Sequence, residues 1–442
     1  MKEEEIIKKV LERVAPSKAE EKKIMGAVRE IEKNISREAE RRGLDVEVML
    51  VGSIAKGTYL KNSLDVDIFM LFPSNYSKEE MREHSLEIGK KVLDDWKIQY
   101  AEHPYVRGRY GDYEVDIVPC YKIKKASEKM SSVDRTPFHT EYIRKNLKDK
   151  NEVRILKQFL KGIGCYGAEI KIQGFSGYLA ELLIIKYGSF RKVLENSQKW
   201  KGKVVLSLNG EPEHDFPEKF VFIDPVDNSR NVAAALSPKK LKFFIFAAGE
   251  YLKNPRMEFF FPREVVPLPV EKIKKSVENF VGICLPRPDL IDDILYSQIK
   301  KAAKNLEKIL REYDFPVVES LYYVNGTVII AAKLEKKKIS GTKLHMGPPE
   351  NEKEHVDAFL SKWKGNAVRG PFMEGGRWWV EIKREYVDAC SLLKDKLGEL
   401  NMGKDLNEMK DRAKICEDGE LVNEDNAAFW TEYFMDKPPW ER

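Results

Sequence analysis

The chain reads Val51-Gly-Ser-Ile-Ala-Lys-Gly-Thr58 near its start and then Leu64-Asp-Val-Asp-Ile-Phe-Met-Leu-Phe72. The second stretch runs from alternating acidic and apolar residues into an apolar segment, which predicts a strand. Residues two apart on a strand share a face, so Asp65 and Asp67 are expected to point the same way, opposite their apolar neighbours. The first stretch predicts the end of a strand, a Gly-Ser turn and a short helix.

A third acidic residue, Asp116, lies in Glu114-Val-Asp-Ile-Val-Pro119, which is also a predicted strand. Burying like charges side by side is costly unless a cation neutralises them. Three strand carboxylates can bind two Mg²⁺ ions, about 4 Å apart, that activate a hydroxyl and stabilise the leaving oxygen of phosphoryl transfer. Ligands that are all oxygen favour Mg²⁺ over zinc.

The turn at Gly52 and Ser53 is suited to a phosphate. It offers backbone N–H groups, a hydroxyl and a helix N-terminus, and Lys56 one turn later supplies a cation. Taken alone, Gly52-Ser53 is more often a plain helix cap, and an isolated Asp-x-Asp is more often a solvated strand end. The combination with a third strand acid is much more specific than either piece.

The rest of the chain divides into three predicted parts, which gives a multidomain α+β fold. The first holds helices over 3–14, 17–42 and 78–96 and strands over 46–51, 64–72, 98–102, 105–110 and 113–118. The second is a mainly helical block with helices over 151–161, 176–190 and 238–252 and a strand over 220–223. The third has a strand over 280–284, a helix over 289–312 and strands over 317–323 and 327–334, an order typical of ferredoxin-like modules.

Composition excludes several classes of protein. The apolar runs of this 442-residue chain are far shorter than a bilayer requires, and the charged start does not resemble a signal peptide, so we expect a cytoplasmic protein without a membrane partner. Five widely spaced cysteines argue against a disulfide framework and against a structural zinc, and predict buried, reduced thiols. The net charge of +5 does not by itself indicate nucleic acid.

The site motifs resemble a known superfamily. A Gly-Ser pair, eleven intervening residues, Asp-Val-Asp in an apolar strand and a third strand acid further on are similar to the signature of the polymerase-beta-like nucleotidyltransferases. Within it, the chain resembles the archaeal, class I CCA-adding enzymes from about residue 45 to 350 and again near residue 376. The stretches that carry this resemblance are Val51-Gly-Ser53, Leu60-Lys-Asn-Ser-Leu-Asp-Val-Asp-Ile68, Tyr100-Ala-Glu-His-Pro-Tyr105, Val115-Asp-Ile-Val-Pro-Cys-Tyr121, Val133-Asp-Arg-Thr-Pro-Phe-His139, Gly174-Phe-Ser-Gly-Tyr-Leu179, Asp224-Pro-Val-Asp227, Arg230-Asn-Val-Ala-Ala234 and Gly376-Arg-Trp-Trp379.

The resemblance implies template-independent addition of C, C and A to the 3′ end of tRNA, with CTP and ATP as substrates and two Mg²⁺ ions as cofactors. It implies a catalytic head over 1–149, a neck over 150–264 that completes the nucleotide pocket, and a ferredoxin-like body and tail over 265–442 that bind tRNA. It leaves a homodimer open. The implied metal ligands and catalytic residues are Asp65, Asp67 and Asp116, and the implied nucleotide-binding residues are Gly52, Ser53, Lys56, His139, Lys157, Tyr166, Arg230 and Asn231.

Each implied contact has an alternative in the residue's own setting. His139 is suited to donate to a triphosphate oxygen, but a lone histidine is as often structural. Lys157 lies next to the apolar stripe of its helix, where it faces either a cleft or water. Tyr166 lies between two glycines that leave it exposed, whereas most tyrosines are packed. Arg230 is implied to read the base edge of the incoming nucleotide, and its structural role would be to pair with Asp224 or Asp227 and stiffen a turn; the two roles are compatible.

Arg377 and Trp378 are predicted tRNA contacts, which stack on exposed bases or ribose. Two adjacent tryptophans on a strand usually have at least one in the core, and core packing is the favoured interpretation. Two rival functions stay open. One is a related RNA nucleotidyltransferase, such as a poly(A) polymerase or an oligoadenylate synthase, and the other is an RNA-binding scaffold whose active site is retired.

Overall fold

The computed structural model describes residues 2–61, 65–100, 103–209 and 211–442, and the predicted strand ends at Leu64 and at 101–102 lie outside these residues. The chain forms two compact units. Unit 1 holds the residues up to Arg263 together with Lys437–Arg442, and unit 2 holds Glu264–Asp436. The division into a head, a neck and a body with tail stays a prediction, and the last six residues, predicted in the tail, belong to unit 1.

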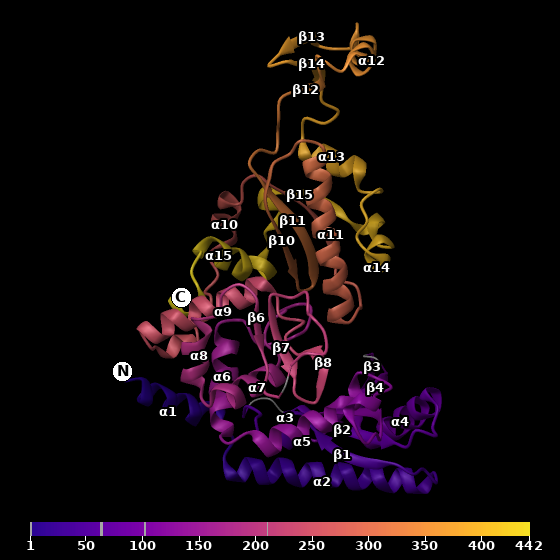
Figure 1. Ribbon diagram of the computed structural model, residues 1–442, viewed down its shortest axis with the longest axis vertical. Coiled ribbons are helices and arrows are strands. Elements are labelled where there is room, and N and C mark those ends of the chain that lie inside the picture. Colours follow the sequence, from indigo (N-terminus) through magenta and orange to yellow (C-terminus); the bar gives the residue numbers. More distant parts are fainter. Residues whose placement is uncertain (1, 62–64, 101–102, 210) are drawn as a thin grey trace. The chain divides into compact units, whose positions relative to one another are not determined.

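The head of unit 1 contains a five-stranded sheet in the order β1-β2-β5-β4-β3 (Figure 1). Its strands are β1 Glu47–Val51, β2 Asp65–Phe72, β3 Asp94–Tyr100, β4 Pro104–Tyr110 and β5 Tyr113–Tyr121. β2 and β5 run parallel, and the other neighbours are antiparallel. The apolar residues Val66, Ile68, Val115 and Ile117 are fully buried on one face, which leaves the opposite face to the acidic residues between them.

Helices α2 (Lys18–Arg41) and α4 (Lys78–Val92) cover the apolar face of this sheet. Each begins with a capping box, in which Ser17 and Ser77 accept from the backbone of Glu20 and Glu80. The prediction that the second helix runs to residue 96 was wrong. It ends at Val92, because the two aspartates that follow are poor helix formers and Asp95 adopts a left-handed φ of 46° at the start of β3.

The neck packs a second core, and the elements that form it come from three parts of the sequence. Its helices are α6 Lys150–Gly162, α7 Gly177–Tyr187, α8 Phe190–Ser197 and α9 Pro238–Lys253, and its small sheet is β6 Val204–Leu206, β7 Phe220–Asp224 and β8 Asp227–Asn231. Helix α5 (Thr136–Asn146), from the predicted head, packs on α7 and buries Ile143 in this core. Helix α1 (Glu3–Val14) packs on α6 and buries Ile6 and Val10 in the same core. Trp440 from the C-terminal end stacks on Phe259, with ring centroids 4.8 Å apart.

Unit 2 contains the ferredoxin-like module that the sequence predicts. Its sheet order is β10-β11-β9-β15, formed by β9 Phe280–Pro286, β10 Val317–Val324, β11 Thr327–Leu334 and β15 Lys414–Glu417. Helices α11 Asp292–Glu312, α13 Ala389–Lys396 and α14 Lys404–Asn407 lie on one face, and α10 Val270–Ser276 and α15 Ala427–Met435 on the other. Strands one and four pair at one side, as the β-α-β-β-α-β order requires.

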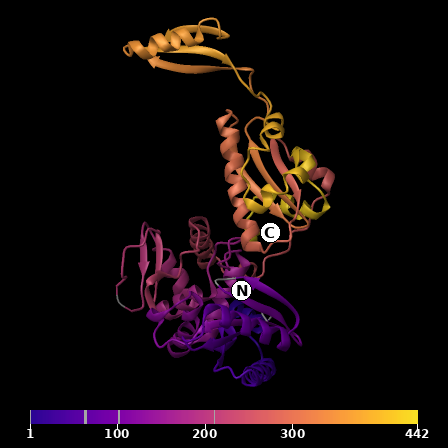
Figure 2. The same cartoon turned by 90° about the vertical axis from the view of Figure 1, so that its right-hand side faces the viewer.

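The tail of unit 2 is inserted between β11 and β15. It is a three-stranded sheet in the order β12-β14-β13, made of β12 Thr342–Pro349, β13 Arg369–Glu374 and β14 Arg377–Lys383. Helix α12 (Lys353–Trp363) lies along one face of this sheet, seen in orange in Figure 2. The rings of Phe359 from α12 and His345 from β12 stack with centroids 6.1 Å apart.

Two composition-based expectations can be compared with the structure. Among the helices that the structure describes, none is long and apolar enough to cross a membrane. The five cysteines are free thiols, of which Cys120, Cys165 and Cys390 are buried. Cys284 and Cys416 are partly exposed on neighbouring strands, so the prediction that all five are buried was wrong.

Candidate active site

The three predicted carboxylates lie on one face of the head sheet. In the parallel pairing of β2 and β5, Asp67 is directly opposite Asp116, and Asp65 precedes Asp67 by two residues. The apolar residues on either side of Asp67 and Asp116 point to the buried face, so alternation places all three carboxylates on the other face. The predicted convergence of the three carboxylates is therefore present.

Placing three carboxylates close together is unfavourable when all three are ionised. Burial, followed by the nearby charges of Asp116 and Asp65, raises the pKa of Asp67 to about 7. Asp116 is turned to Arg107, which donates from Nε to Oδ1 at 2.6 Å and from Nη2 to Oδ2 at 2.8 Å. Arg107 offsets only one of the three carboxylates, and Asp67 is left short of positive charge.

Arg107 was missed by the sequence interpretation, although the signal was present. The predicted turn at Gly111-Asp112 fixes the register of the hairpin that β4 and β5 form. Counting outward from that turn pairs Tyr110 with Tyr113 and then Arg107 with Asp116, as the structure shows. An arginine directly opposite Asp116 on the neighbouring strand was thus readable from the sequence.

Gly52 is required by the carboxylate of Asp67. Its φ is +69°, a conformation that residues with a side chain rarely adopt, and a Cβ at this position would lie 1.9 Å from Oδ2 of Asp67. The carboxylate therefore packs against the bare Cα of Gly52, just where the short helix α3 (Gly52–Lys56) begins. This contact fixes the Gly-Ser turn and Asp67 relative to each other.

The carboxylates have the right donor atoms for a divalent cation, but in this arrangement they do not surround an ion. Their donors are all oxygen, and the raised pKa of Asp67 shows that its ionised form lacks a partner. Within the described residues, no three His, Cys, Asp or Glu side chains are grouped closely enough to enclose an ion. Asp116 is engaged with Arg107 in this arrangement, so an ion at this site would compete with the guanidinium for that carboxylate.

A second polar cluster lies where the head meets the neck. The carboxylate of Glu181, from α7, accepts a hydrogen bond from Lys56 Nζ at 2.6 Å and one from the hydroxyl of Thr58. Lys157 Nζ, from α6, donates to the same carboxylate at 3.3 Å. Glu181 is completely buried, and Lys56 and Lys157 are 8% and 2% exposed. The alternative in which Lys157 faces water was wrong, because its ammonium is buried in this cluster, and its contact with the nucleotide stays a prediction.

Tyr166 and Lys161 lie next to this cluster. A Cβ on Gly177 would be 3.0 Å from Oη of Tyr166 and 3.5 Å from Nζ of Lys157, so both groups lie close to the start of α7. The ammonium of Lys161 lies 5.5 Å from the centre of the Tyr166 ring. Burial, followed by the charge of Lys157, lowers the pKa of Lys161. Tyr166 is half-buried, and burial raises the pKa of its hydroxyl.

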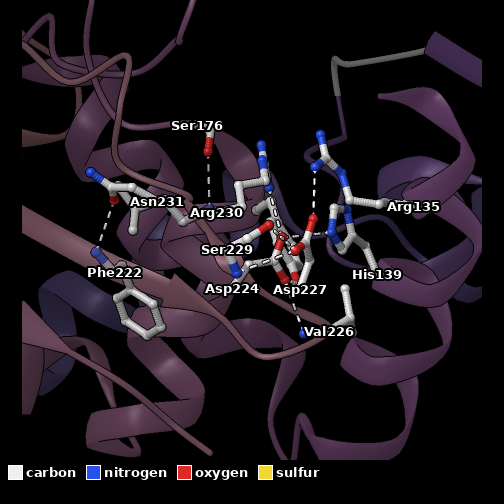
Figure 3. A network of polar contacts seen from close by, with 12 residues as sticks. Arg135, His139, Ser176, Phe222, Asp224, Val226, Asp227, Ser229, Arg230 and Asn231 are labelled. Carbon is white, nitrogen blue, oxygen red and sulfur yellow. Dashed lines mark hydrogen bonds and ion pairs between the residues drawn. The ribbon is translucent and has the colours of Figure 1, made fainter. Parts of the chain in front are cut away.

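A third polar cluster surrounds Asp224 at the end of β7 (Figure 3). This fully buried carboxylate accepts from Arg230 Nη1 at 2.8 Å and from the hydroxyl of Tyr178 at 3.1 Å, and it contacts His139 Nε2 at 2.8 Å. Burial alone would raise the pKa of Asp224, but His139 and Arg230 outweigh it and the pKa is lowered. The pairing of Arg230 with Asp224 is the structural alternative given above.

His139 is held in this cluster by contacts with Tyr178 and Asp224. Its ring stacks on Tyr178 with centroids 4.2 Å apart, and burial lowers its pKa despite Asp224. A neutral imidazole has one N–H, and here Nε2 faces a carboxylate, so the proton belongs on Nε2. The other ring nitrogen is then an acceptor, and a hydrogen bond from it to a phosphate oxygen requires the protonated ring.

The remaining predicted residues of this hairpin stabilise its shape. Asn231 is 5% exposed, and its carboxamide oxygen accepts from Phe222 N at 3.0 Å and from Ala233 N at 2.9 Å. The side chain therefore faces the backbone of β7 (Figure 3), and its nucleotide contact stays a prediction. Nearby, Asp227 accepts from Arg135 Nη1 at 2.9 Å and from Lys129, which ties the loop before α5 to β8.

The tail residues lie in unit 2. Trp378 and Trp379 are consecutive residues of β14, so they point to opposite faces of the tail sheet. Trp378 lies opposite Met373, and Trp379 lies opposite Met346. Trp378 shares its face with Val380, which lies opposite His345 and so under α12, and Trp379 is on the open face beside Arg377. Both tryptophans are partly buried. The favoured core role therefore describes Trp378 better than Trp379.

The comparisons with known proteins define the class first. Residues 30–139 match the family model of a nucleotidyltransferase domain, and residues 151–261 match that of the second domain of tRNA nucleotidyltransferases. Residues 278–418 match the C-terminal domain of CCA-adding enzymes. The chain is thus a nucleotidyltransferase, a class of enzyme that generally uses nucleoside triphosphates and a divalent metal.

Curated relatives narrow this class to one family. A CCA-adding enzyme of Archaeoglobus fulgidus is 42% identical over 393 residues, which cover 87% of this chain and 87% of that protein. One of Methanosarcina barkeri is 37% identical, with 93% of this chain and 95% of that protein covered. The chain belongs to the CCA-adding enzyme family. A solved structure of the Cid1 poly(U) polymerase is 15% identical with a TM-score of 0.45, over 57% of this chain and 94% of that chain, and this similarity is too low to support an argument.

Proposed function

We propose that the protein adds C, C and A to the 3′ end of tRNA, with CTP and ATP as substrates and no nucleic-acid template. The observation that carries this proposal is the match to CCA-adding enzymes over nearly the whole chain, including their own C-terminal domain at residues 278–418. A poly(A) polymerase or an oligoadenylate synthase would share the head but not that domain. The three acidic residues argue against a retired scaffold, since they keep a shared face.

The reaction is an in-line displacement. The 3′ hydroxyl of the tRNA loses its proton and attacks the α-phosphate of the nucleotide, a new phosphodiester bond forms, and the bond to pyrophosphate breaks. Two Mg²⁺ ions, when bound, activate the hydroxyl and stabilise the leaving oxygen. Asp65, Asp67 and Asp116 are the residues that would bind them. Asp116 has to leave Arg107 to do so, and Gly52 keeps Asp67 beside the Gly-Ser turn.

The other side chains bind and orient the nucleotide. Ser53 and the N-terminal turn of α3 face the phosphates, supported by Lys56 and Lys157, with Tyr166 at the edge of the same cluster. Arg230 presents its guanidinium to the base, because Asp224 fixes one side of it and the side chain is still 34% exposed. His139 supports Asp224, and His139 and Asn231 are the further predicted nucleotide contacts.

The tRNA contacts, the location and the assembly of the protein are further parts of this proposal. The body and tail bind the acceptor arm, with Arg377 and Trp378 as the predicted contacts, and the protein works in the cytoplasm. Light scattering of the purified protein answers whether two copies form a homodimer.

A transfer assay tests the proposal directly. The protein is incubated with a tRNA that ends at the discriminator base, with each nucleoside triphosphate singly and in combination, and the 3′ ends are sequenced. We expect two cytidines with CTP alone, a complete CCA end with CTP and ATP, and no addition with GTP or UTP. A long adenosine tail would instead identify a poly(A) polymerase, and no addition at all would support the scaffold.

Thermal unfolding at two pH values tests the metal site. Asp67 binds its proton more tightly in the folded chain than in the unfolded one, because its pKa is raised to about 7. The metal-free protein therefore loses stability from this group as the pH rises from about 4 to about 7, where the folded carboxyl ionises. Mg²⁺ then stabilises the ionised form, so we expect Mg²⁺ to raise the Tm more at about pH 8 than at about pH 5.5.

The matched control for this measurement is Asp67→Asn, which keeps the shape of the side chain and cannot ionise. In this variant the gain from Mg²⁺ should be small and similar at both pH values. An equal Mg²⁺ effect at the two pH values in the unsubstituted protein would show that Asp67 does not bind the ion.

A further inference from the structure

Glu181 is the most unusual residue of the neck. It lies in Leu179-Ala-Glu-Leu-Leu-Ile-Ile185, the apolar middle of α7, and its side chain is fully buried. A buried carboxylate is expensive unless it is paired and hydrogen-bonded. Burial would raise its pKa, but Lys56 and Lys157 outweigh this effect and the pKa is lowered. Glu181 is therefore ionised between two ammonium groups.

The partners of Glu181 come from two parts of unit 1. Lys56 and Thr58 follow the Gly-Ser turn of the head, whereas Lys157 belongs to α6 of the neck. Glu181 contacts all three of these side chains. Two ammonium groups and one carboxylate leave one positive charge in excess, which suits a neighbouring triphosphate.

The hydrogens of the two ammonium groups are not equally free. Lys157 Nζ donates to Thr58 O and to Thr58 Oγ1, both at 3.2 Å, and to Glu181 at 3.3 Å, which uses all three of its hydrogens. Lys56 Nζ, among the described residues, donates only to Glu181, at 2.6 Å, and has two hydrogens left. Lys56 is therefore the lysine free to bind a phosphate oxygen, and Lys157 keeps Thr58 and Glu181 in place.

We propose that Glu181 is a positioning residue of the nucleotide site, which fixes the ammonium of Lys56 at the triphosphate and fastens the head to the neck through Thr58 and Lys157. This inference rests on the proposed function. It goes beyond it by assigning a role to a residue that does not touch the substrate. The competing explanations are a purely structural ion pair and a simple electrostatic effect on the nucleotide.

Glu181→Gln separates these explanations by the sign of the change in nucleotide affinity. The substitution keeps the shape and removes a negative charge. If charge alone mattered, CTP would bind more tightly, because the site becomes more positive. If Glu181 positions Lys56, CTP and ATP bind about tenfold more weakly, since the ammonium loses the partner that orients it. Equilibrium binding of CTP to the full chain, with Tm measured alongside, distinguishes the two.

A double-mutant cycle shows whether Glu181 acts through Lys56. We expect Lys56→Met alone to weaken CTP binding about tenfold, and Lys56→Met combined with Glu181→Gln to weaken it hardly further. Glu152→Gln is the matched control, because this neck carboxylate accepts from Phe190 N at 2.6 Å and touches neither lysine. Its Tm should fall while CTP affinity stays unchanged.

Two outcomes overturn the inference. One is a lower Tm for Glu181→Gln with unchanged or tighter CTP binding, and the other is full additivity in the cycle. If Glu181→Gln does not fold, Thr58→Val removes the third anchor without changing charge, and it should weaken CTP binding severalfold. An unsubstituted protein that binds no nucleotide would refute the proposed function itself, which is a different result.

Discussion

Asp116→Ala is expected to reduce nucleotide addition about a thousandfold or more, while the affinity for tRNA stays within about twofold. The loss is large because this carboxylate lies opposite Asp67 and completes the set that would bind the metal ions. The tRNA affinity persists because phosphate contacts on the rest of the protein do not involve this side chain. Single-turnover incorporation of CTP and a filter-binding titration of tRNA measure the two quantities.

Two further variants control this experiment. Asp112→Ala removes an acidic residue at the turn that joins β4 and β5, where it forms an exposed ion pair with Lys23 at 2.9 Å, and activity should be unchanged. Asp116→Ala also leaves Arg107 without its carboxylate partner. Arg107→Met keeps all three carboxylates, so it shows whether the loss of this ion pair, and not the loss of a metal ligand, lowers the activity. Activity of Asp116→Ala within tenfold of the unsubstituted protein would remove Asp116 from the site.

Arg230→Ala should weaken the discrimination against GTP and UTP by about ten- to a hundredfold, which is the range that a paired base contact contributes. The arginine is fixed by Asp224 at 2.8 Å, so its remaining donors have a defined direction. The ring nitrogen on the base-pairing edge of cytosine or adenine can accept a hydrogen bond from a guanidinium held in this way. In guanine and uracil that ring nitrogen carries a hydrogen and would face the guanidinium as a second donor. Competition between CTP and UTP in the transfer assay gives the ratio directly.

The controls separate base reading from the stability of the hairpin. Arg230→Lys keeps a positive charge for Asp224 but lacks the planar fork, so discrimination should be lost while Tm is largely retained. Arg135→Ala removes an ion pair of similar length, 2.9 Å, between Arg135 and Asp227, which lies on the same hairpin as Arg230. Its Tm should fall without a change in nucleotide choice. If Arg230→Ala excludes GTP and UTP as strictly as the parent, the base-reading role is wrong.

The sequence predicted those features that local chemistry determines. Alternation placed Asp65 and Asp67 on one face and Asp116 opposite its own apolar neighbours, whereas the pairing of β2 with β5 that joins the three is seen only in the structure. The β-α-β-β order gave the ferredoxin-like module. Gly52 was recognised as part of a turn, but its close contact with Asp67 depends on how β2 lies beside α3. The end of α4 was placed too late, because the charge pattern continues past the two aspartates that stop it.

Contacts between residues far apart in the chain could not be predicted from the sequence. Lys157 was expected at a cleft or in water, since nothing near it in sequence announces Glu181 twenty-four residues later. A lone glutamate inside an apolar helix is nevertheless a signal that a cation must come from elsewhere. In the same way, α1 was assigned to the head by its position in the chain, whereas its apolar stripe packs in the core of the neck.

The return of the last six residues to unit 1 changes how unit 2 is attached. Unit 2 leaves unit 1 after Arg263, and the chain comes back at Lys437, where Trp440 is inserted into the core of the neck. In topological terms unit 2 is an insertion with two tethers, and not an appendage on one linker. The packing of Trp440 on Phe259 therefore fixes the second of the two places where the chain passes between the units.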